Sequence, residues 1–304
     1  MHKSRREFFK KSAALLGTAL FAQLSARAWA RGPLKHTGPP EIKLSCAAYS
    51  FRKYLTAKDP KQRMTLEDFI DLCAEWKLDG TELTSYYFPK PVTDEYLAKL
   101  KKKANDLGLQ ISGTAIGNNF FLPPGAKRDE QIALCKQWTD YCAKMGGRTV
   151  RIFAGGGIPK GATEDEAVRW AVECIEECCK VAAEKKIYLC LENHGSYTSQ
   201  VDNLLRIVRE VKSEWCAVNL DTGNFRDYDG YLSIRKAAPY AAVVQVKTHV
   251  RVAGRSEPAD YKRIIDILRA ANFQGYVSLE YEDKEDPKTA VPRHIKALKQ
   301  AISG

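Results

Sequence analysis

The sequence predicts an α/β fold, a single-domain (β/α)8 TIM barrel, on three observations. Eight apolar strand-like runs alternate with eight longer segments of 3.6-residue periodicity. Successive runs begin 26 to 39 residues apart, a spacing that favours parallel pairing through right-handed crossovers. Eight such units need about 250 residues, and the chain beyond residue 30 has that length.

The strands are expected where aliphatic and β-branched residues cluster. In chain order they are Leu44–Tyr49, Gly80–Thr84, Gln110–Ala115, Thr149–Ala154, Tyr188–Glu192, Ala217–Asp221, Val243–Thr248 and Val277–Tyr281. A doubly wound open sheet is the competing fold. It would be expected to carry a glycine-rich phosphate turn after its first strand, where this chain reads Ala48-Tyr49-Ser50-Phe51-Arg52.

Helices are expected between these strands, where apolar residues recur every three or four positions. They are Leu66–Trp76, Asp94–Leu107, Asp129–Met145, Glu164–Lys185, Gln200–Lys212, Tyr231–Ala237, Pro258–Ala271 and Pro287–Ile302. The chain after the first 30 residues carries a net charge of +6, and its basic residues are scattered along these helices. Such a distribution is typical of solvated helix faces, so we expect no nucleic-acid partner.

The first 30 residues resemble a twin-arginine export signal. Arg5 and Arg6 precede an apolar run at 13–22, and Ala28-Trp29-Ala30 forms a small-x-small cleavage site. We therefore expect a signal peptide at 1–30, an N-terminal strap at 31–41 and the barrel at 42–304. The mature protein would be periplasmic or otherwise extracytoplasmic, with no stable membrane association after cleavage. A basic amphipathic anchor helix is the alternative interpretation.

The nine cysteines are odd in number and include no C-x-x-C pair. Most fall at apolar helical positions or inside strand-like runs, where a thiol behaves as a small hydrophobic side chain. We interpret them as buried thiols rather than as a disulfide framework, a zinc site or a redox site.

Polar residues stand at the ends of the last four expected strands, and in a TIM barrel the strand C-termini form the active site. They are Glu192, Asp221, Gln245 and Glu280. Three carboxylates in one semi-buried mouth would repel each other, and a divalent cation would remove that conflict. The four residues therefore predict an all-oxygen metal site, for which Mg²⁺ or Mn²⁺ is favoured over Zn²⁺ or Co²⁺.

Four short motifs carry a resemblance to a known family. They are Leu191-Glu192-Asn193-His194, Leu220-Asp221-Thr222-Gly223-Asn224, Gln245-Val246-Lys247 and Ser278-Leu279-Glu280. In this order they resemble the sugar phosphate isomerase/epimerase family, the xylose isomerase-like TIM barrels that include ketose 3-epimerases and endonuclease IV. The resemblance implies a divalent metal on Glu192, Asp221 and Glu280, and two glutamates that move a proton next to a carbonyl.

The third metal ligand departs from the family pattern, which usually has His-x-Lys-Asp on the seventh strand where this chain has Gln245-Val246-Lys247-Thr248. Gln245 is the positional match here, and His249 is the rival, about 7 Å further along the strand direction. We favour Gln245 as the ligand, because an amide oxygen suits a hard cation.

Five further side chains are candidates for catalysis or substrate binding. His194 and Lys247 are candidate catalytic groups, the first as an acid or base and the second as a partner of an enolate oxygen. Glu82, Asn224 and His249 are candidate substrate-binding residues. Each also has a structural interpretation, as a loop residue, a turn residue or an ion-pair partner.

The leading functional hypothesis is a metal-dependent isomerase or epimerase of a sugar or keto-sugar, acting through an enediolate. A keto-sugar lyase or hydratase that uses the same proton abstraction for β-elimination is the alternative, and a non-catalytic carbohydrate-binding barrel is a third. A nuclease like endonuclease IV is disfavoured, because its zinc cluster needs many histidines and only four follow residue 30. The sequence leaves the sugar and any homo-oligomer open.

Overall fold

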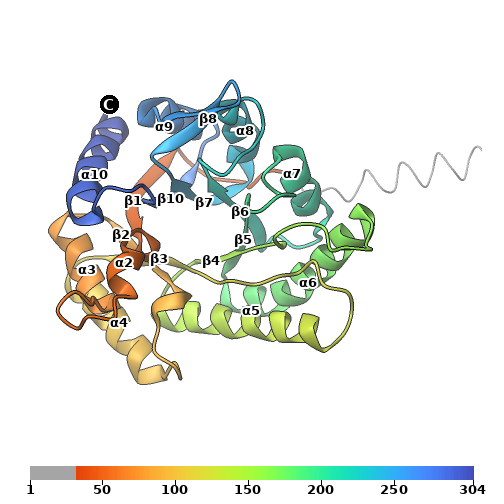
Figure 1. Ribbon diagram of the computed structural model, residues 1–304, viewed down its shortest axis with the longest axis horizontal. Coiled ribbons are helices and arrows are strands. Elements are labelled where there is room, and N and C mark those ends of the chain that lie inside the picture. The colour runs from red at the N-terminus through yellow and green to blue at the C-terminus, as the bar shows by residue number, and fades with distance from the viewer. Residues whose placement is uncertain (1–31) are drawn as a thin grey trace, which may run out of the picture.

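The computed structural model describes residues 32–304, and these form the predicted TIM barrel. Eight parallel strands close in the order β1-β10-β7-β6-β5-β4-β3-β2. Figure 1 shows the strands at the centre of the molecule and the helices around them. The expected export signal at 1–30 lies outside the described residues.

The barrel strands follow the predicted runs closely. They are β1 (Glu41–Ala47), β2 (Gly80–Thr84), β3 (Gln110–Ala115), β4 (Thr149–Ile152), β5 (Tyr188–Glu192), β6 (Cys216–Asp221), β7 (Ala241–Val246) and β10 (Gln274–Leu279). β7 and β10 each begin earlier and end two residues earlier than predicted, which places Lys247 and Glu280 just beyond their strands. Across the sheet Glu192 pairs with Asn219, and Asp221 pairs with Gln245.

The helices that cover the barrel are α3 (Leu66–Glu75), α4 (Asp94–Asp106), α5 (Ala126–Met145), α6 (Glu164–Lys185), α7 (Val201–Glu210), α8 (Gly230–Ala237), α9 (Tyr261–Ala270) and α10 (Pro287–Ser303). Short turns of helix follow β1, β2 and α8: η1 (Ala48–Phe51), α2 (Arg52–Leu55), η2 (Ser85–Tyr87) and η3 (Ala238–Tyr240). Thr65 and Thr163 form capping boxes with Asp68 and Glu166, which fix where α3 and α6 begin.

An antiparallel hairpin is the element that the sequence analysis did not predict. It consists of β8 (His249–Val252) and β9 (Arg255–Pro258) and follows β7 directly. α9 consequently begins at Tyr261 and not at Pro258 as predicted. The four residues of β9 are exposed, so the hairpin carries little of the hydrophobic pattern by which strands are recognised.

The strap before β1 lies across the end of the barrel opposite the strand C-termini. Gln274 Nε2 donates to the carbonyl oxygens of Thr37 and Pro39 at 2.7 and 2.9 Å. Leu34 packs on the small apolar cluster of Cys190, Ala217 and Val243. The strap therefore covers the bottom of the barrel, and the opposite end is left to the functional residues.

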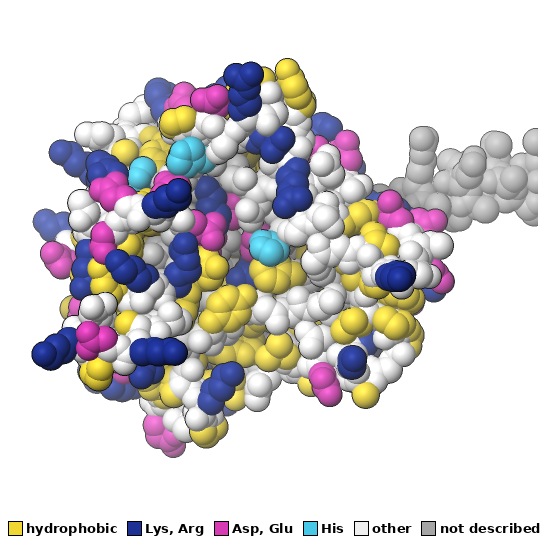
Figure 2. All heavy atoms as spheres, viewed as in Figure 1, with side chains coloured by type: hydrophobic (Ala, Val, Ile, Leu, Met, Phe, Trp, Pro, Cys, Tyr) yellow, Lys and Arg dark blue, Asp and Glu magenta, His cyan; other side chains and the backbone are white. Residues whose placement is uncertain are grey.

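The core confirms the interpretation of the cysteines, since all nine are buried. Within residues 32–304 no helix has both the length and the apolar character needed to cross a membrane. Figure 2 shows basic and acidic side chains interspersed over the visible face, as expected for solvated helices.

Candidate active site

Four polar side chains meet at the C-terminal end of the barrel, as the sequence analysis predicted. Glu192 and Asp221 end β5 and β6, Gln245 lies on β7, and Glu280 follows β10. All four are buried. The ends of β5 and β6 are tied together by Asn193, whose side chain accepts from the backbone N–H of Asp221 at 2.9 Å and donates to its carbonyl at 2.8 Å.

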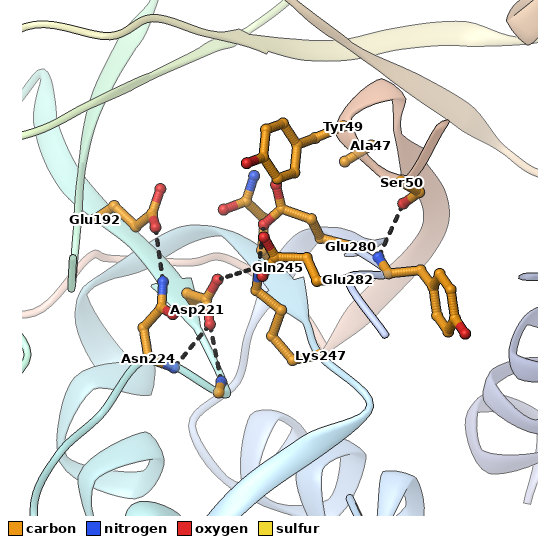
Figure 3. Close-up of polar contacts among 12 residues, drawn as sticks. Ala47, Tyr49, Ser50, Glu192, Asp221, Asn224, Gln245, Lys247, Glu280 and Glu282 are labelled. Atoms are coloured by element: carbon orange, nitrogen blue, oxygen red, sulfur yellow. Dashed lines mark hydrogen bonds and ion pairs between the residues drawn. The ribbon is translucent and has the colours of Figure 1, made fainter. Parts of the chain in front are cut away.

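The ammonium group of Lys247 lies in the middle of this arrangement (Figure 3). Its Nζ is 2.8 Å from Glu280 Oε2 and 3.4 Å from Asp221 Oδ2, and it also pairs with Glu282. The Lys247 side chain is only 11% exposed. Burial opposes its charge, but the three carboxylates outweigh that effect and raise the pKa of Lys247 well above its ordinary value. The carboxylates therefore favour the charged form of Lys247.

Glu192 has a cation of its own. Its Oε2 lies 3.1 Å from Nε of Arg151, a buried residue of β4. Its Oε1 accepts a hydrogen bond of 3.0 Å from the side-chain amide of Asn224. Burial raises the pKa of Glu192, Arg151 opposes that rise, and the neighbouring Asp221 and Glu280 add to it. The group can therefore exchange a proton more easily than an exposed glutamate near neutral pH.

Gln245 is held from both sides of its amide. Its Oε1 accepts from Asn219 Nδ2 at 2.7 Å, and its Nε2 donates to Glu82 Oε1 at 2.8 Å. Glu82 is buried, and burial together with the charge of Glu280 raises its pKa to about 7. Asn219 and Glu82 thus fix which end of the Gln245 amide faces which neighbour.

These contacts decide whether the residues fit the divalent cation predicted from the sequence. The Gln245 oxygen already accepts a hydrogen bond, Lys247 lies against Asp221 and Glu280, and Arg151 pairs with Glu192. No group of three or more His, Cys, Asp or Glu side chains within residues 32–304 is placed to hold a metal ion. The four predicted ligands nevertheless offer oxygen donors only, and Asp221 Oδ2 is buried without a hydrogen-bond partner among the described residues, so the donor set itself suits a hard divalent cation.

His194, Asn224 and His249 line a cleft of about 350 Å³ beside this cluster. Its other walls include Arg226 of the β6 loop and Arg251 of the hairpin. The His194 ring lies on Phe153, with the ring centroids 4.3 Å apart. Burial and the nearby Arg151 lower the pKa of His194, so the imidazole is neutral near pH 7. The cleft is polar and large enough to hold part of a small hydrophilic molecule.

His249, the rival metal ligand, lies apart from the carboxylate cluster. It begins the hairpin, and its Nδ1 is 3.1 Å from Thr248 Oγ1 and 3.4 Å from Asp283 Oδ1. It shares a cleft with His194 and Asn224, as a substrate-binding residue would.

Two charged members of the site were missed by the sequence analysis. Arg151 stands between Val150 and Ile152, and a lone arginine inside a short apolar strand was the signal that could have revealed it. Glu282 comes two residues after Glu280 and reaches the same Lys247 from the loop. Its position in a run of charged residues gave no sign of that role.

A comparison with protein-family models matched residues 70–301 to the xylose isomerase-like TIM barrel family. The chain belongs to this family. A comparison with curated protein sequences found no match.

Solved structures with the same fold include several enzymes. The 3-keto-D-glucoside 4-epimerase of E. coli shares 15% identity over 86% of this chain and 99% of its own, with a TM-score of 0.67. A probable 3-DHS dehydratase of Bacillus anthracis shares 18%, over 86% and 99%, with a TM-score of 0.64. The IolI protein, solved with a zinc atom, shares 18%, over 85% and 96%, with a TM-score of 0.65. At these identities the likeness establishes the fold.

Proposed function

We propose that this protein is a sugar isomerase or epimerase that removes and returns a proton at a carbon next to a carbonyl. The observation that carries the proposal is the placement of two buried glutamates, Glu192 paired with Arg151 and Glu280 paired with Lys247, at the end of the barrel where TIM-barrel enzymes have their active sites. The family supports it, and the epimerase among the structural neighbours acts on a keto-sugar.

In this proposal one glutamate takes the proton from carbon and the other supplies a proton to complete the reaction. The electron pair of the broken C–H bond moves onto the carbonyl oxygen, where negative charge builds up. Lys247, held 2.8 Å from Glu280, is the cation next to that oxygen. His194 and Asn224 would bind substrate hydroxyl groups from the adjoining cleft.

A divalent metal was part of the sequence prediction, and in the family such an ion supplies Lewis-acid polarisation of substrate oxygens. Glu192, Asp221, Gln245 and Glu280 would hold such an ion, and the unpartnered Asp221 Oδ2 supports this. No step above depends on it. The bases, the cation and the cleft are all provided by the chain.

The proposal is tested by incubating the protein in D2O with a panel of free and 3-keto sugars and following the products by NMR. Deuterium at one carbon next to the carbonyl, with isomer or epimer formed, is the expected result. Loss of water or of an aglycone after the same exchange would indicate the lyase or hydratase alternative. A probable dehydratase is among the structural neighbours of this chain. Binding of a sugar without any exchange would overturn the proposal in favour of a carbohydrate-binding barrel.

We also propose that residues 1–30 direct export by the twin-arginine route, on the basis of Arg5, Arg6 and the Ala28-Trp29-Ala30 cleavage site.

A further inference from the structure

The bottom of the barrel, opposite the candidate active site, contains a second cavity. Its volume is about 560 Å³, and small-molecule sites typically have about 300 to 1,000 Å³. Its buried lining includes Ser112 of β3, Thr149 of β4 and Val243 of β7, and its outer lining includes residues of the strap and the residues just before β4 and β5. The cavity therefore lies between the strap and the interior of the barrel, and no part of the proposed reaction uses it.

The lining of this cavity carries more basic than acidic side chains. Lys35, Lys43, Arg148 and Lys186 line it, and Glu41 is the only acidic residue among its described lining residues. Glu41 lies 3.1 Å from Lys43 Nζ and compensates that charge. The lining thus leaves three cations, Lys35, Arg148 and Lys186, without a carboxylate of their own. Such a concentration of positive charge in a hollow attracts anions.

The strap is held on both sides of Lys35, which keeps this residue at the cavity. The N–H of Leu34 donates to the carbonyl oxygen of Pro239 at 2.9 Å, and Gln274 holds the strap further along through two backbone carbonyls. His36 lines the cavity as well. Burial lowers the pKa of His36, so its imidazole is neutral near pH 7 and offers a hydrogen bond without a charge.

A buried hydroxyl group in the lining has no partner. Ser112 is only 2% exposed, and its Oγ makes no hydrogen bond within the part of the chain that the structure describes. A buried polar atom of this kind costs free energy unless something satisfies it. An oxygen of a bound molecule would accept from this hydroxyl. Ser112 therefore distinguishes the cavity from a merely basic surface.

Aromatic side chains form another part of the lining. The rings of Tyr188 and Trp215 lie 5.3 Å apart with a tilt of 38°, and both residues are half-buried. Tyr276 also lines the cavity, and its hydroxyl donates to Gln110 Oε1 at 2.8 Å. Partly exposed aromatic faces provide a surface against which a flat ring can pack.

We propose that this cavity binds a small organic anion, namely a phosphate or sulfate monoester of a flat ring. The tetrahedral oxyanion group binds to Lys35, Arg148 and Lys186. One of its oxygens accepts a hydrogen bond from Ser112 Oγ. The ring packs on the half-buried aromatic pair described above.

The position of the three cations gives the ligand a structural effect. Lys35 belongs to the strap, whereas Arg148 and Lys186 belong to the barrel. A ligand that contacts all three fastens the strap to the barrel. Because it binds the folded chain alone, it raises the melting temperature as its concentration increases.

The first test titrates phenyl phosphate and phenyl sulfate into the purified protein by calorimetry, at about 0.15 M NaCl to screen weak surface attraction. We expect one site with a Kd below about 1 mM for at least one ester. The stronger binder identifies the anionic group. Benzyl alcohol, which has the ring without the charge, should bind at least about 10-fold more weakly. Absence of binding by both esters, or equal binding of benzyl alcohol, would overturn the proposal.

The second test locates the bound ester. Arg148→Met and Ser112→Ala should each weaken binding by about 10-fold, because each removes a donor to the oxyanion. Arg169→Met makes the same change of charge at an exposed residue of α6 outside the cavity and should bind like the wild type. Melting without ligand checks that each variant is folded. Wild-type affinity in both cavity variants would place the ester elsewhere and refute the site.

Discussion

The guanidinium of Arg151 lies 3.1 Å from the carboxylate of Glu192, and both side chains are almost completely buried. The guanidinium carbon of Arg151 also lies 4.0 Å from the centroid of Phe153, whose ring packs on His194. One arginine of β4 thus connects a candidate base of β5 with a wall of the substrate cleft. Neither contact could be derived from the motifs alone.

This pair makes the first prediction. Arg151→Met leaves the Glu192 carboxylate buried without its cation, and breaking such a pair costs about 3 to 5 kcal/mol. The double variant Arg151→Met, Glu192→Met removes both charges and should recover most of that loss. Urea denaturation of the two variants beside the wild type measures the effect. Equal stability of Arg151→Met and the wild type would show that the pair is not formed.

The second prediction concerns the contact between Gly223 and Lys247. Gly223→Ala forces the lysine stem to move, and overpacking of this kind costs about 1 to 3 kcal/mol. Turnover should fall more than stability, because the ammonium leaves its place among the carboxylates. Gly156→Ala is the matched control, since a Cβ there meets nothing within 4 Å. Full activity in Gly223→Ala would argue against a precise position for Lys247.

The third prediction concerns acid stability outside the carboxylate cluster of the candidate active site. Asp286 caps α10 through the N–H of Lys288 and accepts hydrogen bonds from Tyr54 at 2.6 Å and Lys53 at 2.9 Å. The bonds from Tyr54 and Lys53 lower the pKa of Asp286 to about 2. Because the folded state holds the carboxylate ionised, its contribution is present above the unfolded pKa of about 3.9 and is lost as the pH falls toward 2.

Asp286→Asn should therefore lower the melting temperature at pH 7 and flatten its decline between about pH 4 and pH 2. Melting curves over that range test this, with Asp106→Asn at the exposed end of α4 as the control. A decline as steep as that of the wild type would assign the acid sensitivity to other groups.

The fourth prediction concerns export. Changing Arg5 and Arg6 to Lys should leave precursor in the cytoplasm, since the paired arginines are what the export machinery is expected to recognise. Fractionation and N-terminal sequencing check this, and wild-type protein should begin at Arg31. Arg27→Lys, outside the pair, should be processed normally. Normal processing of the paired variant would leave the proposed route without support.

The barrel itself was predictable because its signal is repeated along the chain. Runs such as Tyr188–Glu192 and Cys216–Asp221 are almost entirely buried, so each is mostly apolar before its polar end, with Asn219 as the exception. The hairpin of β8 and β9 escaped prediction for the opposite reason, because all four residues of β9 are exposed and Val250 is the one buried residue of β8.

The candidate site was predictable in its members and less so in their contacts. Strand ends identified Glu192, Asp221, Gln245 and Glu280, and alternation placed Lys247 on the same side as Gln245. Alternation gives a direction but not the reach of a four-carbon side chain. The sequence therefore could not reveal that the Lys247 ammonium would lie among the carboxylates, or that Asn219 and Glu82 would engage Gln245.

The most direct measurement of the central claim is solvent deuterium incorporation by the purified protein, with Glu280→Gln and Glu192→Gln beside the wild type. The account predicts that the wild type places deuterium on one carbon next to a sugar carbonyl. Each glutamine variant should be slower by about 100-fold or more, because it has lost an acid–base group. Exchange at the same rate in all three proteins, or no exchange with any sugar tested, would contradict the account.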